Sequence, residues 1–233
     1  MASRFATTRW TIILQAADSS SSRGRASLEQ LCNDYWAPLH SWVQTAGYGA
    51  QDAEDLTQAF FAHLLSKALH VGVDPVKGRF RNWLIAVFKH FMLNERRRAT
   101  TQKRGGTDRE DVSLEQLDAH LSDHVTPDRV YERKWAHAII YHALERLQRE
   151  CEAQGHHQRF TVLQPVLFGE AHGEFQIEER AAQLGITVNA ARVTLTRLRQ
   201  RYRELLRVEV GRLVETPDEV DDEIAHIIAI LRG

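Results

Sequence analysis

The chain has 233 residues, of which 43% are hydrophobic and 26% charged, a composition typical of a globular protein with one large or two small domains. No apolar run approaches the roughly 20 residues of a membrane-spanning helix, and Cys32 and Cys151 lack the spacing of a metal site. These features predict a cytoplasmic protein with reduced thiols, no membrane insertion and no metal site.

The net charge of −1 conceals a strong segregation of charge along the sequence. Cations dominate residues 77–104 and 188–212, whereas acids dominate residues 107–128 and the tail 213–233. Basic blocks of this kind are typical of surfaces that bind nucleic acid. The acidic blocks indicate segments that stay off DNA or imitate its charge.

Apolar residues recur at helical spacing in most of the chain, and no clear run of alternating β-branched residues occurs, so the sequence predicts an all-α fold. A short first helix is followed by residues 19–25 (SSSSRGR), which we expect to be flexible. Helices are then predicted over 28–46 and 52–69, with a break at Gly47-Tyr48-Gly49 between them.

The helix predicted over 52–69 has an acidic beginning. The helix dipole alone can explain Asp52, Glu54 and Asp55 in its first turn. Asp55, Gln58 and Ala62 also share one face opposite the apolar stripe, and a small acidic face of this kind can receive a basic partner helix. The residues by themselves are compatible with both explanations.

The loop 70–78 leads into residues 77–98 (KGRFRNWLIAVFKHFMLNERRR), which combine four aromatic residues with seven cations and one acid. Phosphate attracts the cations, and unpaired bases stack on aromatic or arginine planes, so this segment is a candidate for binding single-stranded nucleic acid. Helical geometry places the four aromatic residues in one stripe, which predicts that most of them are buried packing. The charged face then carries the functional signal.

The second half of the chain begins with a linker. Residues 102–127 are polar and acidic and predict a linker with at most a short helical stretch at 114–121. Helices are predicted next over 131–152 and 160–168. We expect the segments 8–17 and 216–231, which also have apolar stripes, to pack on their own domains. The alternative for the C-terminal segment is a regulatory or partner-binding element.

Residues 177–202 have the spacing of a helix-turn-helix. Ala181 suits a close helix crossing, Gly185 suits a positive φ at the end of the first helix, and Thr187 can cap the second. The predicted buried stripe of the second helix consists of Ala191, Leu195, Leu198 and Tyr202. The alternative to a DNA-reading motif is an ordinary pair of packed helices.

Three segments together resemble a bacterial RNA polymerase sigma factor of the extracytoplasmic-function type. Residues 52–65 (DAEDLTQAFFAHLL) are similar to the family's polymerase-docking helix, residues 80–98 to its promoter-melting helix, and residues 179–202 to its minus-thirty-five helix-turn-helix. The resemblance implies five parts, which are an N-terminal extension (1–27), a region-two-like domain (28–101), an acidic linker (102–127), a region-four-like domain (128–210) and a C-terminal extension (211–233).

The resemblance also implies three sets of site residues. The polymerase-binding set is Asp52, Asp55, Gln58, Phe61 and Ala62. The minus-ten set is Lys77, Arg79, Arg81, Asn82, Lys89, Asn94, Arg96 and Arg97. The minus-thirty-five set is Thr187, Asn189, Ala190, Arg192, Val193, Thr196 and Arg197. Loop 70–78 would capture a flipped base, and the linker would thread the polymerase's basic channel.

The implied function is promoter recognition and transcription initiation with core RNA polymerase and promoter DNA as partners, without enzymatic activity or a cofactor. An anti-sigma protein or another regulator is a further partner that the resemblance leaves open. The family pattern is broken at Arg180, Val193 and Thr196, so individual base contacts do not carry over. No common catalytic signature occurs in the sequence. The alternatives are a helix-turn-helix regulator that acts without stable polymerase docking, and a module that sequesters a sigma-like partner.

Overall fold

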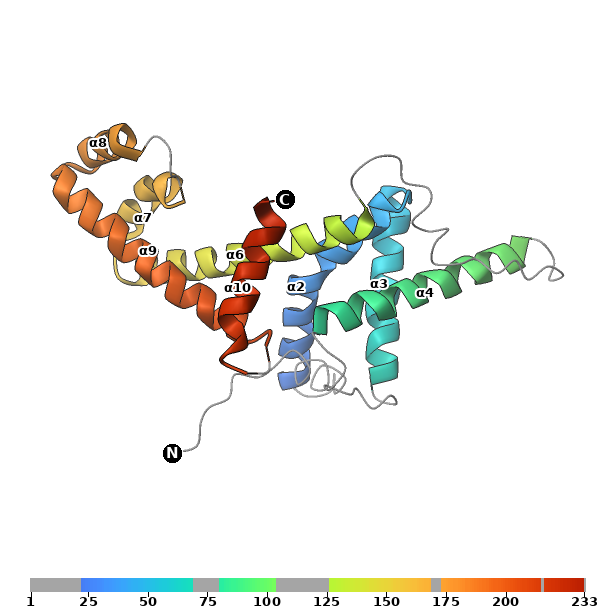
Figure 1. Cartoon of the computed structure of the whole chain (residues 1–233). Coiled ribbons are helices and arrows are strands. Elements are labelled where there is room, and N and C mark those ends of the chain that lie inside the picture. The colour runs from blue at the N-terminus through green and yellow to red at the C-terminus, as the bar shows by residue number, and fades with distance from the viewer. Residues whose placement is uncertain (1–21, 69–79, 104–125, 169–172, 215, 233) are drawn as a thin grey trace, which may run out of the picture. The chain divides into compact units, whose positions relative to one another are not determined.

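The computed structural model describes residues 22–68, 80–103, 126–168, 173–214 and 216–232 (Figure 1). The predicted all-α fold is confirmed, since the described residues form helices and turns and no strand. The chain divides into two compact units. Unit one comprises Met1–His137 and Arg212–Gly233, and unit two comprises Ala138–Gly211.

The unit boundaries fall at helices rather than in the predicted linker. One boundary lies inside α6 (Pro127–Ala153), between His137 and Ala138, and the other follows the last residue of α9 (Val188–Gly211). The first turns of α6 and the C-terminal segment therefore belong to unit one, whereas the sequence assigned residues 128–210 to one domain. The linker residues 104–125 and the segment 8–17 lie outside the described residues.

Unit one contains α2 (Ser22–Thr45), α3 (Ala50–Ala68), α4 (Phe80–Lys103), the beginning of α6, and α10 (Glu219–Arg232). Helix α2 packs on α3, and α3 packs on α4. The predicted break after α2 is confirmed, because Gly47 has a φ of +93°. Residues 22–25 belong to α2 and are not the flexible segment that the sequence predicted.

Aromatic rings form the centre of unit one. Phe60 of α3 contacts Phe88 of α4 with ring centroids 4.8 Å apart, and Trp42 of α2 contacts the same Phe88 at 5.5 Å. Phe80, Phe88 and Phe91 are buried, and Trp83 is half-buried. The prediction that most aromatic residues of the basic helix are core is therefore confirmed.

Helix α10 corrects one expectation. The sequence predicted that the C-terminal segment packs on its own domain, which by chain order is the second one, but α10 belongs to unit one. Its buried residues are Val220, Glu223 and Ile227, and Glu223 forms an ion pair with Arg81 of α4. The error arose because the spacing of apolar residues identifies the buried face of a helix and not the surface that covers it.

Unit two contains the rest of α6, α7 (His157–Leu163), η2 (Gln164–Val166), α8 (Gly173–Leu184) and α9. Helix α7 is shorter than the predicted helix over 160–168 because Pro165 lies in η2, and proline has no N–H to continue the α-helical hydrogen bonds. A buried cluster that includes Leu147, Leu163 and Leu205 joins these helices.

Candidate nucleic-acid interface

A tight turn joins α8 to α9. The N–H of Ile186 donates to the carbonyl of Ala181 and the N–H of Gly185 to that of Ala182, both at 3.1 Å, which is the Schellman pattern of helix ends. Gly185 has a φ of +64°, and the hydroxyl of Thr187 accepts a hydrogen bond from the N–H of Ala190 at 3.2 Å. The predicted positive φ and the predicted cap are both confirmed.

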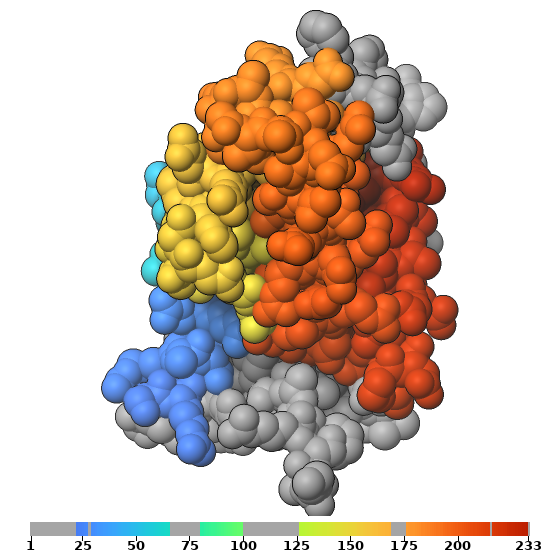
Figure 2. Space-filling view, turned by 90° about the vertical axis from the view of Figure 1, so that its left-hand side faces the viewer, coloured from blue at the N-terminus to red at the C-terminus, as the bar shows by residue number. Residues whose placement is uncertain are grey.

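Helix α9 has one buried side and one exposed side. Ala191, Leu195 and Tyr202 are buried, Leu198 is partly buried, and they pack in one cluster with Ala181 of α8. The predicted minus-thirty-five residues are all exposed; they are Thr187, Asn189, Ala190, Arg192, Val193, Thr196 and Arg197. Figure 2 shows α9, in orange, at the surface of unit two. The structure thus brings the predicted minus-thirty-five residues together at the beginning of one helix.

The side chains on the exposed side of α9 suit the edges of bases. Arginine can bind guanine through two hydrogen bonds, asparagine can bind adenine in the same way, and an apolar group can contact the methyl group of thymine. Val193 is 44% exposed, so its side chain is accessible for an apolar contact with a base. The hydroxyl of Thr196 donates to the carbonyl of Arg192 at 2.9 Å, so its oxygen remains an acceptor.

Other arginines of α9 hold unit two together. Arg199 donates to the carbonyls of Val166 and Leu167 at 2.9 and 3.0 Å. Arg201 binds the carboxylate of Glu150 through two hydrogen bonds of 2.7 and 2.9 Å, and these bonds lower the pKa of Glu150. The sequence placed neither Arg199 nor Arg201 in the minus-thirty-five set, but it did not predict their partners, which lie far away along the chain.

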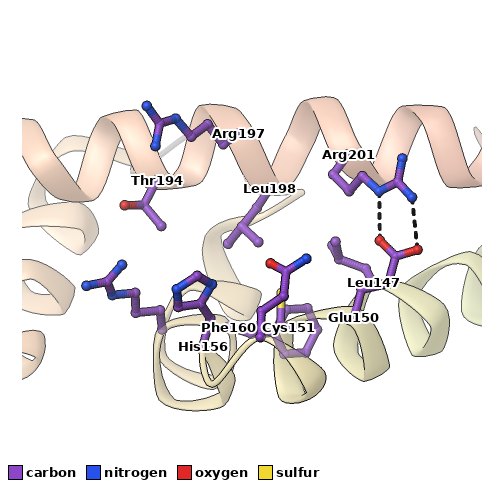
Figure 3. A pocket seen from close by; sticks show the side chains of 11 residues that line it. Leu147, Glu150, Cys151, His156, Phe160, Thr194, Arg197, Leu198 and Arg201 are labelled. Atoms are coloured by element: carbon purple, nitrogen blue, oxygen red, sulfur yellow. Dashed lines mark hydrogen bonds and ion pairs between the residues drawn. The ribbon is translucent and has the colours of Figure 1, made fainter.

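A cavity of about 320 Å³ lies beside the Arg201–Glu150 pair, between α6, α7 and α9 (Figure 3). Leu147, Cys151, Phe160 and Leu198 give it an apolar lining, and Arg197 lies at its edge on α9. Burial raises the pKa of the Cys151 thiol, which reduces its reactivity. No pattern in the sequence predicts this cavity, since its lining comes from three separate helices.

Helix α4 presents only part of the predicted minus-ten set. Asn82, Asn94 and Arg97 are exposed, and Arg96 is partly exposed. Lys77, Arg79 and loop 70–78 lie outside the described residues.

Two cations of α4 differ from the prediction of an open basic face. Arg81 is 5% exposed, pairs with Glu223 and lies 4.4 Å from the ring centroid of Trp135. Lys89 is mostly buried and pairs with Asp128, which also accepts a hydrogen bond from the indole N–H of Trp42 at 2.8 Å. In this conformation Arg81 and Lys89 therefore serve ion pairs within unit one.

Helix α3 presents most of the predicted polymerase-binding set. Asp52, Asp55, Gln58 and Ala62 are exposed. Phe61 is 4% exposed and stacks on Trp36 with ring centroids 5.6 Å apart, so its ring belongs to the core and not to an open docking surface. Because α3 begins at Ala50, Asp52 is the acid in its first turn, and the helix dipole explains Asp55 less well than expected.

No protein-family model, curated protein or solved structure matches this chain. Among the described helices, none is both long and apolar enough to cross a membrane. The part of the chain that the structure describes holds no group of three or more potential metal-ligating side chains. The chain's own helices and the residues that they expose therefore carry the evidence for its function.

Proposed function

We propose that this protein is a sigma-like initiation factor that binds core RNA polymerase and directs it to promoter DNA. The observation that carries the proposal is the arrangement of α9, whose buried stripe packs on α8 while six of its residues suited to base edges are exposed together. A helix presented in this way after a short turn fits the major groove of duplex DNA. In this proposal unit two reads the minus-thirty-five element.

Unit one supplies the two other surfaces that initiation requires. The exposed residues Asp55, Gln58 and Ala62 on α3 form a small acidic face that suits a basic surface of the polymerase. The exposed polar residues of α4, including Asn82 and Arg97, would contact the opened minus-ten strand. The protein would contribute binding energy that offsets the cost of opening the duplex, and no covalent chemistry.

The second candidate is a helix-turn-helix regulator that binds duplex DNA without polymerase. The internal ion pairs of Arg81 and Lys89 favour it, because they leave α4 with fewer cations for a DNA strand. It gives no role to the exposed acidic face of α3. The two candidates differ most directly in whether the chain binds core polymerase.

A pull-down of core polymerase by the tagged full chain tests the proposal. We expect stable capture at moderate salt and a loss of about tenfold or more in affinity for Asp55→Lys, because like charges would then meet at the interface. Glu54→Lys is the matched control, since Glu54 is exposed on a neighbouring face of the same helix. Absence of capture by the wild-type chain would eliminate the sigma-like function and leave the regulator.

A further inference from the structure

The contact between α10 and α4 contains a buried charge pair. The exposed fractions of the Arg81 and Glu223 side chains are 5% and 1%, and the two groups form an ion pair. The guanidinium also lies over the ring of Trp135, and the hydroxyl of Tyr131 donates to the backbone carbonyl of Arg81 at 3.3 Å. All four residues belong to unit one.

Stability alone does not account for this pair. Removing two charged groups from water costs free energy that their attraction often fails to recover, and apolar residues of similar volume commonly stabilise a protein at least as well. The best-attested role of buried charged groups is to fix the register of packed elements or to bias a conformational switch. Arg81 belongs to α4 and Glu223 to α10, so the ion pair forms only while α10 is packed against α4.

The surroundings of Arg81 are those of an anion site. A guanidinium presents a planar fork of donors that matches a phosphate as well as it matches a carboxylate. The ring of Trp135 supports that plane, as aromatic rings do for arginines at nucleic-acid interfaces. In the described conformation the carboxylate of Glu223 occupies the position that an anionic ligand would take.

We propose that Arg81 and Trp135 form a binding site for a phosphodiester of single-stranded DNA, which Glu223 occupies until α10 detaches. The inference rests on the proposed function, because that function assigns α4 to the opened strand. Val220 and Ile227 accompany Glu223 in the buried face of α10, and Ile224, Ile230 and Leu231 are partly buried, so an apolar contact also holds the helix.

Fluorescence anisotropy of a labelled single-stranded deoxyoligonucleotide with the full chain tests the inference. We expect Glu223→Gln to bind about tenfold more tightly than the wild type, a change that corresponds to about 1.4 kcal/mol. Asp222→Asn removes the same charge from an exposed neighbouring position, and we expect it to stay within about twofold of the wild type because exposed charges are screened. Adding Arg81→Met to Glu223→Gln should abolish the gain.

Hydrogen exchange of the wild-type chain provides a second measurement that needs no substitution. We expect the amides of α10 to exchange faster when the oligonucleotide is added, because binding would displace the helix. The inference is overturned if α10 stays equally protected, if no oligonucleotide binds even at low salt, or if folded Glu223→Gln binds no more tightly than Asp222→Asn. If the oligonucleotide measurements fail while the chain still captures polymerase, the proposed function stands. If polymerase capture fails while Glu223→Gln still binds the oligonucleotide more tightly, only the proposed function is removed.

Discussion

The arginines of this protein serve different purposes according to what surrounds each guanidinium. Arg199 satisfies the carbonyls of Val166 and Leu167, and Arg201 holds the carboxylate of Glu150, so both contribute to the fold of unit two. Arg192 is exposed near the beginning of α9. An arginine is therefore a candidate for DNA recognition only where its guanidinium points away from the core and does not hold two helices together.

Arg192→Ala tests the reading of bases by α9. If Arg192 binds a guanine through two hydrogen bonds, we expect a loss of about 1–3 kcal/mol and a relaxed preference at one base pair. Binding to a set of promoter duplexes with single base-pair changes measures this. Arg203→Ala, an exposed arginine farther along the same helix, is the control. Equal weakening on every duplex would mean that Arg192 contacts phosphate instead.

The Glu150–Arg201 pair predicts a pH dependence of stability. The hydrogen bonds from Arg201 hold the pKa of Glu150 below its ordinary value of 4.5, so the pair stabilises the fold above that pH and loses its effect as the pH falls through the lowered pKa. We expect Glu150→Gln to cost at most about 1 kcal/mol at pH 7, because both side chains are partly exposed. Urea unfolding at pH 7 and below pH 4 should show this difference shrink, and a constant difference would contradict it.

At the scale of single helices, local sequence predicted much of the structure. The bounds of α3, to within two residues, the beginning of α9, the break at Gly47 and the cap at Thr187 follow from spacing and turn chemistry over a few residues. Local sequence did not predict the burial of Phe61 and Arg81, because their partners Trp36 and Glu223 come from other helices. The candidate site was therefore predictable on α9, where the exposed side depends on one helix, and only partly on α4.

Gly185→Ala tests how the turn positions α9. A φ of +64° disfavours any residue with a Cβ by about 1–2 kcal/mol, and no atom lies within 4 Å of an added Cβ, so the whole cost is conformational. We expect that loss in the free energy of unfolding, measured by urea titration. Gly185→Asn should lose less, because asparagine tolerates this conformation better. An equal loss for both variants would indicate a steric clash.

At the scale of the whole molecule, the division into units differs from the division that the sequence predicted. Residues 126–137 and α10 join α2, α3 and α4, so unit one combines segments from the beginning, middle and end of the chain. This arrangement places the C-terminal helix against the cationic helix that the proposed function assigns to the melted strand. Regulation of DNA access by α10 would then be a property of unit one itself.

Mapping of transcript start sites in a reconstituted reaction tests whether this chain directs core RNA polymerase to promoters. Core RNA polymerase and a library of promoter fragments would be transcribed with and without the full chain. We expect new start sites whose upstream DNA shares two short elements, one for each unit. Start sites that are the same with and without the protein would contradict it.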